Sequence, residues 1–324
     1  MRKLLLLLMM FCCTACTALP AEERAFAVAL CAEKQGEAWQ MHARIPAYKT
    51  GGEYLTVSGK GKDVALALAD LDASAPMQTS LSQLRLLVLS DQLKGADVDD
   101  LLTYLADQYD VRLQCAVAMT DASAKAVADA LKPDTGARLS KAIDILLESR
   151  IRQGSVPKAT LAEIIRMGER QSPVLMRLSL QEGKPDLSGA YPLGRGGQIL
   201  PKLTEEETAL LSLLRGDTKE LQLSLMGEGV RVRDVCAKAA LAEDLRTARV
   251  TLTMKVLSSA VSPDDVESAL AQACAELLSR LSAEGCDALG LGRKASLCLK
   301  DMAAWQEAYP GIQWIVSVRA EGPA

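Results

Sequence analysis

The chain has 324 residues, 49% of them apolar, with 37 basic and 41 acidic side chains and a net charge of −4. This apolar fraction excludes an intrinsically disordered chain, and the length favours two or three domains over a single small core. The mild negative charge indicates no nucleic-acid partner.

The N-terminus carries the pattern of an export signal. Arg2 and Lys3 precede an unbroken apolar run, 4–13. That run is about half of the roughly 20 apolar residues that a membrane-spanning helix needs, so a signal segment is the better interpretation. Two small residues, Thr14 and Ala15, stand directly before Cys16, which resembles a bacterial lipobox. We therefore predict cleavage after residue 15 and lipidation of the Cys16 sulfur. The alternative is ordinary cleavage after Ala18, which would release a soluble protein.

The segment 16–135 is predicted to be an N-terminal α/β-like domain. After an opening hairpin, strands and helices alternate along it, as in α/β folds. A helix following the strand 84–90 is predicted to be capped by Ser90 or Asp91. Strands are predicted at 24–31, 38–45, 53–61, 84–90 and 111–119, and helices at 63–72, through Val98–Leu105, and at 121–131.

The segment 136–217 is predicted to be a middle α+β domain. It begins with helices at 139–152 and 159–171 and continues with a strand at 172–183. The stretch 184–203 is predicted to form two strands joined by a Gly-Arg-Gly-Gly turn. Thr204 and Glu207 are predicted to form a capping box for a helix that runs to Arg215 and is stopped by Gly216.

The segment 218–324 is predicted to be a C-terminal α+β domain. Alternating apolar residues over 219–258 indicate an antiparallel meander. A long helix from Ser262 through Ala283 has proline in its first turn, as is common there. A last helix over 293–311 and a strand over 312–322 complete the chain. The fold class is therefore α+β and multi-domain, with antiparallel sheets and long helices after the α/β-like part.

Apolar patterning also predicts core and thiol positions. Cys31, Cys115 and Cys236 lie in apolar runs, which favours buried free thiols, although an exported protein could pair its cysteines. Six cysteines follow Cys16, at 31, 115, 236, 274, 286 and 298. The predicted core includes Leu84, Leu86, Val88, Leu178, Leu180, Trp305 and Trp314.

No catalytic motif stands out along the chain. His42 is the only histidine, so Ser–His and Cys–His systems depend on it, and its place in a strand favours a structural role. The glycines at 194–197 lack the spacing of a phosphate-binding loop. The turn at 290–294 is followed by a helix whose N-terminus could attract an anion, although a structural turn explains it more simply. No Cys/His cluster indicates a metal, and we predict no enzyme, cofactor or metal site.

Several stretches together resemble the Ger(x)C spore germination lipoproteins, the C subunits of nutrient germinant receptors. No single stretch is specific, but they follow one another in the order of the family. They are the signal with Cys16, "YLTVSGKGKDVALALADLDASAPMQTSLSQLRLLVLSDQL" (54–93), "VRLQCAVAMTDASAKAVADAL" (111–131), "LSGAYPLGRGGQILPKLTEEETALLSLLRG" (187–216) and "CDALGLGRKASLCLKDMAAWQEAYPGIQWIVSVRAEG" (286–322).

The resemblance implies a three-domain lipoprotein on the outer face of the spore's inner membrane. It implies a non-catalytic subunit that assembles with a polytopic A-type and a transporter-like B-type subunit and is needed for nutrient-triggered germination. A different hypothesis is a lone exported lipoprotein that binds a small ligand or an envelope polymer. In both cases Cys16 is the one site residue that we single out.

Overall fold

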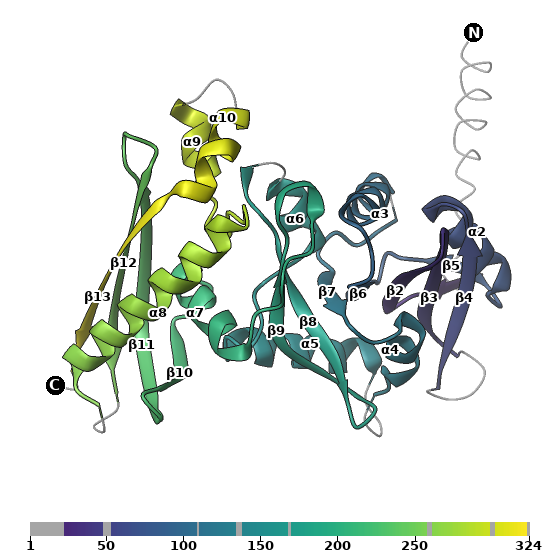
Figure 1. Ribbon diagram of the computed structural model, residues 1–324. Coiled ribbons are helices and arrows are strands. Elements are labelled where there is room, and N and C mark those ends of the chain that lie inside the picture. Colours follow the sequence, from purple (N-terminus) through teal and green to yellow (C-terminus); the bar gives the residue numbers. More distant parts are fainter. Residues whose placement is uncertain are drawn as a thin grey trace, which may run out of the picture.

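The computed structural model is built around two large sheets with their helices, one nearer each end of the chain (Figure 1). A seven-stranded sheet is built from the N-terminal part, and a four-stranded sheet from the C-terminal part. The structure describes residues 23–47, 53–108, 110–133, 138–167, 170–257, 261–298 and 302–322.

The seven-stranded sheet has the order β4-β3-β2-β6-β7-β8-β9. Its four middle strands, β2, β6, β7 and β8, run parallel, and antiparallel neighbours close both edges. The strands predicted at 38–45, 53–61, 84–90 and 172–183 are confirmed. The strand predicted at 111–119 begins only at Ala116, because the residues before it form a turn. The strands are β2 (Ala29–Gln35), β3 (Ala38–Pro46), β4 (Tyr54–Gly61), β6 (Leu86–Ser90), β7 (Ala116–Thr120), β8 (Val174–Gln181) and β9 (Lys184–Pro192).

Helices cover both faces of this sheet. Since successive side chains of a strand point to opposite faces, Leu87 and Leu89 pack in one core cluster, and Leu86 and Val88 pack in another. The first cluster holds α2, α3 and α6, and the second holds α4 and α5. The bounds are α2 (Val64–Ser74), α3 (Gly95–Asp107), α4 (Ala124–Ala130), α5 (Leu139–Arg152) and α6 (Leu161–Met167).

The predicted strand 24–31 is two strands. β1 (Arg24–Phe26) pairs in parallel with β5 (Gln78–Ser80) as a separate small sheet, and β2 then enters the large sheet. The chain changes partner at Ala27, whose N–H donates to the carbonyl of Ser80. The prediction of one continuous strand was therefore wrong, because two different neighbours divide the apolar run between them.

The four-stranded sheet has the order β10-β11-β12-β13 and carries α7 and α8 on one face. Its first three strands form the predicted antiparallel meander, and its last strand runs parallel to β12 because α8 carries the chain back along the sheet. The bounds are α7 (Glu205–Arg215), β10 (Glu220–Leu225), β11 (Glu228–Leu241), β12 (Thr247–Val256), α8 (Pro263–Ala283) and β13 (Gln313–Glu321).

The predicted domain boundary at 135/136 lies within the span of the large sheet. Strands β8 and β9, at 174–192, come from the predicted middle segment and pair with β7. Residues 16–135, 136–217 and 218–324 remain predicted divisions of the chain, although one sheet joins the first to the second.

Three local predictions differ from the structure. Helix α3 is capped at Lys94, with the Asp97 carboxylate bonded to the Lys94 N–H, and not at Ser90 or Asp91. The second half of 184–203 makes only isolated bridges around the 3₁₀ helix η3 (Arg195–Gly197), because Pro201 has no N–H to pair. The last predicted helix is two helices and a 3₁₀ turn, α9 (Gly292–Cys298), α10 (Met302–Ala308) and η4 (Tyr309–Gly311).

Most of the predicted core is buried. Leu180 and Trp314 are half-buried at the margins of their clusters, while the other five side chains are fully or almost fully buried. Cys236 was predicted to be buried and is exposed, because its side chain lies on the uncovered face of β11. The other free thiols among the described side chains, Cys31, Cys115, Cys274 and Cys286, are buried.

Candidate functional site

A cleft of about 840 Å³ lies between the two halves of the molecule. Helices α3 and α6 form one wall, and the end of α8 with α10 and η4 forms the other. The η3 turn at 195–197 closes one side. These segments lie far apart in the sequence, so no local motif could have indicated the cleft.

The rim of the cleft is acidic and its floor is apolar. Asp99, Asp107 and Glu284 are exposed at the rim, together with Arg195. On the floor, the rings of Trp305 and Tyr309 lie 5.3 Å apart and tilted by 49°. A volume in this range with mixed lining is typical of small-molecule sites.

Asp287 holds the turn that the sequence placed at 290–294. One carboxylate oxygen accepts the N–H of Leu291 at 2.9 Å, and the other accepts that of Gly292 at 2.6 Å. Burial raises the pKa of Asp287 to about 6, although the hydrogen bonds from the backbone act to lower it. A carboxylate of the chain therefore already accepts both N–H groups. This favours a structural turn over an anion-binding site at the start of α9.

The glycine-rich stretch 194–197 is also a turn. The N–H of Gly194 donates to the carbonyl of Gln198 at 2.7 Å, and Gly196 and Gly197 have positive φ. A Cβ on Gly95, at the start of α3, would lie 2.4 Å from the carbonyl oxygen of Gly196. The turn therefore packs directly on α3 and fixes one side of the cleft.

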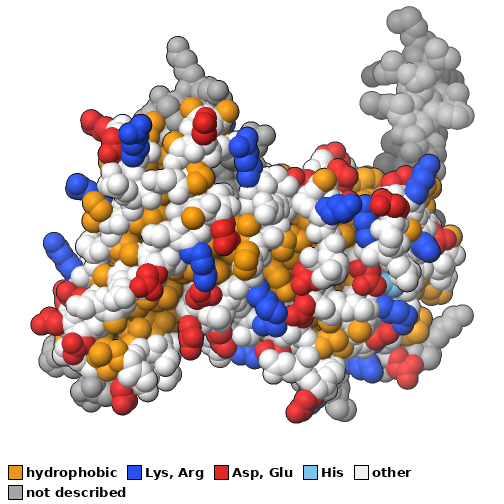
Figure 2. Space-filling view, in the orientation of Figure 1, with side chains coloured by type: hydrophobic (Ala, Val, Ile, Leu, Met, Phe, Trp, Pro, Cys, Tyr) orange, Lys and Arg blue, Asp and Glu red, His pale blue; other side chains and the backbone are white. Residues whose placement is uncertain are grey.

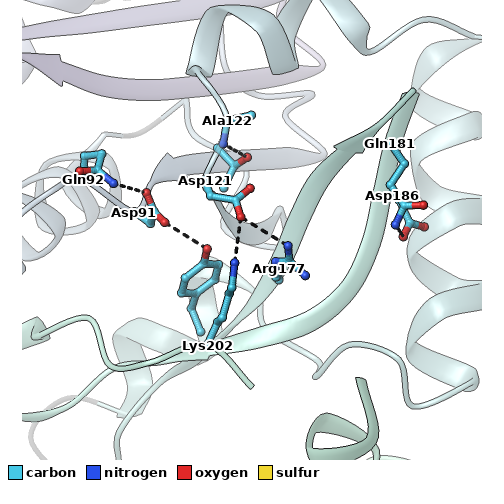
Figure 3. Close-up of polar contacts among 10 residues, drawn as sticks. Asp91, Gln92, Asp121, Ala122, Arg177, Gln181, Asp186 and Lys202 are labelled. Carbon is cyan, nitrogen blue, oxygen red and sulfur yellow. Dashed lines mark hydrogen bonds and ion pairs between the residues drawn. The ribbon is translucent and has the colours of Figure 1, made fainter. Parts of the chain in front are cut away.

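A polar cluster lies just beyond the carboxyl ends of β6 and β7 (Figure 3). Asp121 accepts bonds from Lys202 at 3.1 Å and from Arg177 at 3.4 Å, and Asp91 accepts the hydroxyl of Tyr191 at 3.2 Å. Burial works to raise the pKa of Asp121, but Lys202 and Arg177 outweigh it and hold that pKa below its usual value. Open α/β sheets commonly bind ligands at this edge. Here the side chains are paired with one another, and the cluster ties β6 and β7 to β8 and β9.

His42 is buried and has a structural role in the sheet. Its Nδ1 lies 2.8 Å from the Ser58 hydroxyl, and its Nε2 lies 3.6 Å from a Glu33 oxygen. Burial lowers the pKa of His42, with the charge of Glu33 opposing, so the ring is neutral at pH 7. Across the residues that the structure describes, no group of three or more His, Cys, Asp or Glu side chains is arranged to hold a metal.

Charge is well mixed over the visible surface. Figure 2 shows Lys and Arg side chains interspersed with Asp and Glu on the face of Figure 1. Cys16, the predicted lipidation site, lies outside the described residues. Within 23–322, apart from the gaps given above, no helix is both long and apolar enough to cross a membrane.

Comparison with known proteins identifies the family. A model of the "Spore germination protein N-terminal domain" matches residues 19–180, half of the chain. A structure described as "Crystal Structure of the GerBC protein" matches with a TM-score of 0.53 at 13% identity. That match covers 91% of this chain and 97% of the other, and at this identity it establishes a shared fold. A search of curated proteins found no match. The extent of the domain match shows that the protein belongs to the Ger(x)C family of spore germination proteins.

Proposed function

We propose that the protein is a non-catalytic, membrane-anchored lipoprotein subunit of a spore germinant receptor. The observation that carries the proposal is the spore germination domain over residues 19–180, which begins three residues after Cys16. The GerBC-like fold over nearly all of the chain supports it.

Cys16 is the proposed anchor. Cleavage before it would leave a lipidated cysteine seven residues from Glu23, where the described chain begins. Several acyl chains on one sulfur and its amino group hold a protein at a membrane stably, whereas a single chain holds it marginally. The body would then lie at the outer face of the spore's inner membrane.

The proposed partners are a polytopic A-type and a transporter-like B-type subunit. Anchoring raises the effective concentration of the body near membrane-bound partners. Germinant binding elsewhere would shift a two-state complex, and this subunit would stabilise one state or the assembly. The buried, neutral His42 and the internally paired carboxylates of the Figure 3 cluster support a role without catalysis.

The second candidate function is that of a lone exported lipoprotein that binds a small ligand. The 840 Å³ cleft favours it, because its acidic rim and aromatic floor form a recess of ligand size. The two candidates differ in whether other subunits accompany the protein.

The anchor is tested by Cys16→Ser, with Cys13→Ser as a matched control in the same signal. We expect Cys16→Ser to leave the precursor uncut or to release the protein from spore membranes, and to impair nutrient-triggered germination. Cys13→Ser should leave maturation and membrane partitioning unchanged. Normal maturation and partitioning of Cys16→Ser would refute the lipid anchor.

The receptor role is tested by affinity purification of the tagged protein from detergent-solubilised spore membranes, followed by mass spectrometry. Co-purification of A- and B-type subunits would support the receptor. Recovery of the protein from membranes without them would favour the lone lipoprotein.

A further inference from the structure

A second, smaller pocket of about 420 Å³ lies beside the cleft, and Gln171 lines both. It is formed where α6 of the first half meets the end of α7, the strand β11 and the segment leading into α9. Its charged lining residues are Glu163, Arg166, Arg215, Asp217, Arg293 and Lys294.

This pocket is basic although the whole chain is acidic. Four cationic side chains line it against two carboxylates, in a protein whose net charge is −4. Both carboxylates are already engaged, Glu163 with Lys158 at 3.1 Å and Asp217 with Arg215 at 3.0 Å. Among the described residues, neither Arg166 nor Arg293 forms a salt bridge, although the charge of Arg293 acts on the buried Asp287. The Nε of Arg166 donates to the carbonyl of Ala162 at 3.2 Å, and Lys294 donates to the carbonyl of Ala239. The other guanidinium N–H groups of Arg166 and Arg293 are available to a ligand.

Arg215 adds a buried donor without an acceptor. Its side chain is 10% exposed, and its Nε lies 3.0 Å from a carboxylate oxygen of Asp217. Its Nη2 donates weakly to the Lys158 carbonyl at 3.5 Å, but its Nη1 is buried without a hydrogen-bond partner. Oδ2 of Asp217 is likewise buried without a hydrogen-bond partner, although it is ion-paired with the Nε of Arg215. An unsatisfied buried donor is unfavourable, and more so on a charged group. An acceptor entering the pocket would therefore find a preorganised guanidinium.

We infer that this pocket binds a compact oxyanion, a phosphate or carboxylate group, between Arg166, Arg215 and Arg293. Guanidinium groups offer planar pairs of N–H donors that match the oxygens of both groups, and such charge-assisted bonds are among the stronger ones. Arg166 comes from α6 and Arg293 from α9, so the bound anion would join the two halves of the molecule. The inference does not depend on the receptor proposal.

The test is isothermal titration of the full-length protein in neutral detergent with inorganic phosphate and with succinate. Sodium chloride at matched ionic strength controls for general salt effects. The variants are Arg166→Gln and Arg293→Gln, both exposed and therefore safe for the fold, with the exposed Arg249→Gln on β12 as a control. We expect each pocket variant to weaken binding about tenfold or more, and the control to bind as wild type.

A second arm of the experiment distinguishes a free anion from a lipid headgroup. In it, mixed micelles with phosphatidylglycerol replace the free anions. Binding that depends on Arg166 and Arg293 in the free-anion arm supports a small-molecule ligand. The same dependence only in the micelle arm supports a lipid headgroup in the same site. Absence of binding in both arms, or equal loss in Arg249→Gln, would overturn the inference.

Discussion

At the scale of single residues, burial changes the ionisation of Asp287, a residue that no sequence motif distinguishes. It is 6% exposed at the edge of the cleft, and its carboxylate clamps the backbone of Leu291 and Gly292. In the unfolded chain an aspartate ionises near its ordinary pKa of about 3.9, whereas burial raises the folded pKa of Asp287 to about 6. The folded state therefore binds an additional proton between these values.

The stability that this proton provides is fully present below about pH 4 and is lost as pH rises through about 6. A difference of about two pKa units corresponds to about 3 kcal/mol. We expect Asp287→Asn, which cannot ionise, to gain stability relative to wild type by up to about that amount between pH 4 and 7. The difference between the two thermal midpoints, measured across this range, checks it. A constant difference would show that Asp287 does not titrate there.

At the scale of elements, α7 has the clearest local signal in the chain. The Thr204 hydroxyl accepts the N–H of Glu207 at 3.2 Å, the Glu207 carboxylate accepts the N–H of Thr204 at 2.9 Å, and Gly216 ends the helix in the left-handed region. All three features were predicted from the sequence. Glu207 also pairs with Arg280 of α8 at 2.6 Å, which the sequence did not indicate.

Thr204→Ala should destabilise the protein by about 1 kcal/mol, because the first turn loses its side-chain acceptor. Thr204→Ser keeps the hydroxyl and should change the free energy of unfolding by much less. Chemical denaturation of both variants measures the difference. Equal losses in the two variants would mean that the methyl group, and not the cap, carries the contribution.

At the scale of the whole molecule, one apolar core joins the two sheets. It contains Val174 and Ala190 of the large sheet, Leu211 of α7, and the inward side chains of β10, β11 and β12. Because α7 packs between them, neither half buries its apolar surface alone. We therefore expect the halves to unfold together.

Calorimetry of the wild type should show one main unfolding transition. Leu211→Ala, at a fully buried site, should destabilise that transition as a whole by about 2–5 kcal/mol. Leu297→Ala, at an 86% exposed site, should change stability by less than about 0.5 kcal/mol. Two separate transitions, of which Leu211→Ala shifts only one, would contradict a shared core.

The sequence alone determined most elements of this protein, because hydrophobic periodicity, capping residues and glycine or proline stops act over a few neighbours. The helix from Leu139 to Arg152, the α7 cap and the meander before α8 follow from such local patterns. The order of family-like stretches likewise indicated the family, and the domain match confirmed it.

Only the tertiary structure decided where the strands pair and where the cavities lie. The division of 24–31 between two sheets, the exposure of Cys236 and the parallel pairing of β13 depend on neighbours distant in sequence. The cleft brings together Gln171 and Asp287, and the basic pocket brings together Arg166 and Arg293, each pair more than a hundred residues apart. Long-range packing sets burial and charge at these sites, and no local pattern encodes it.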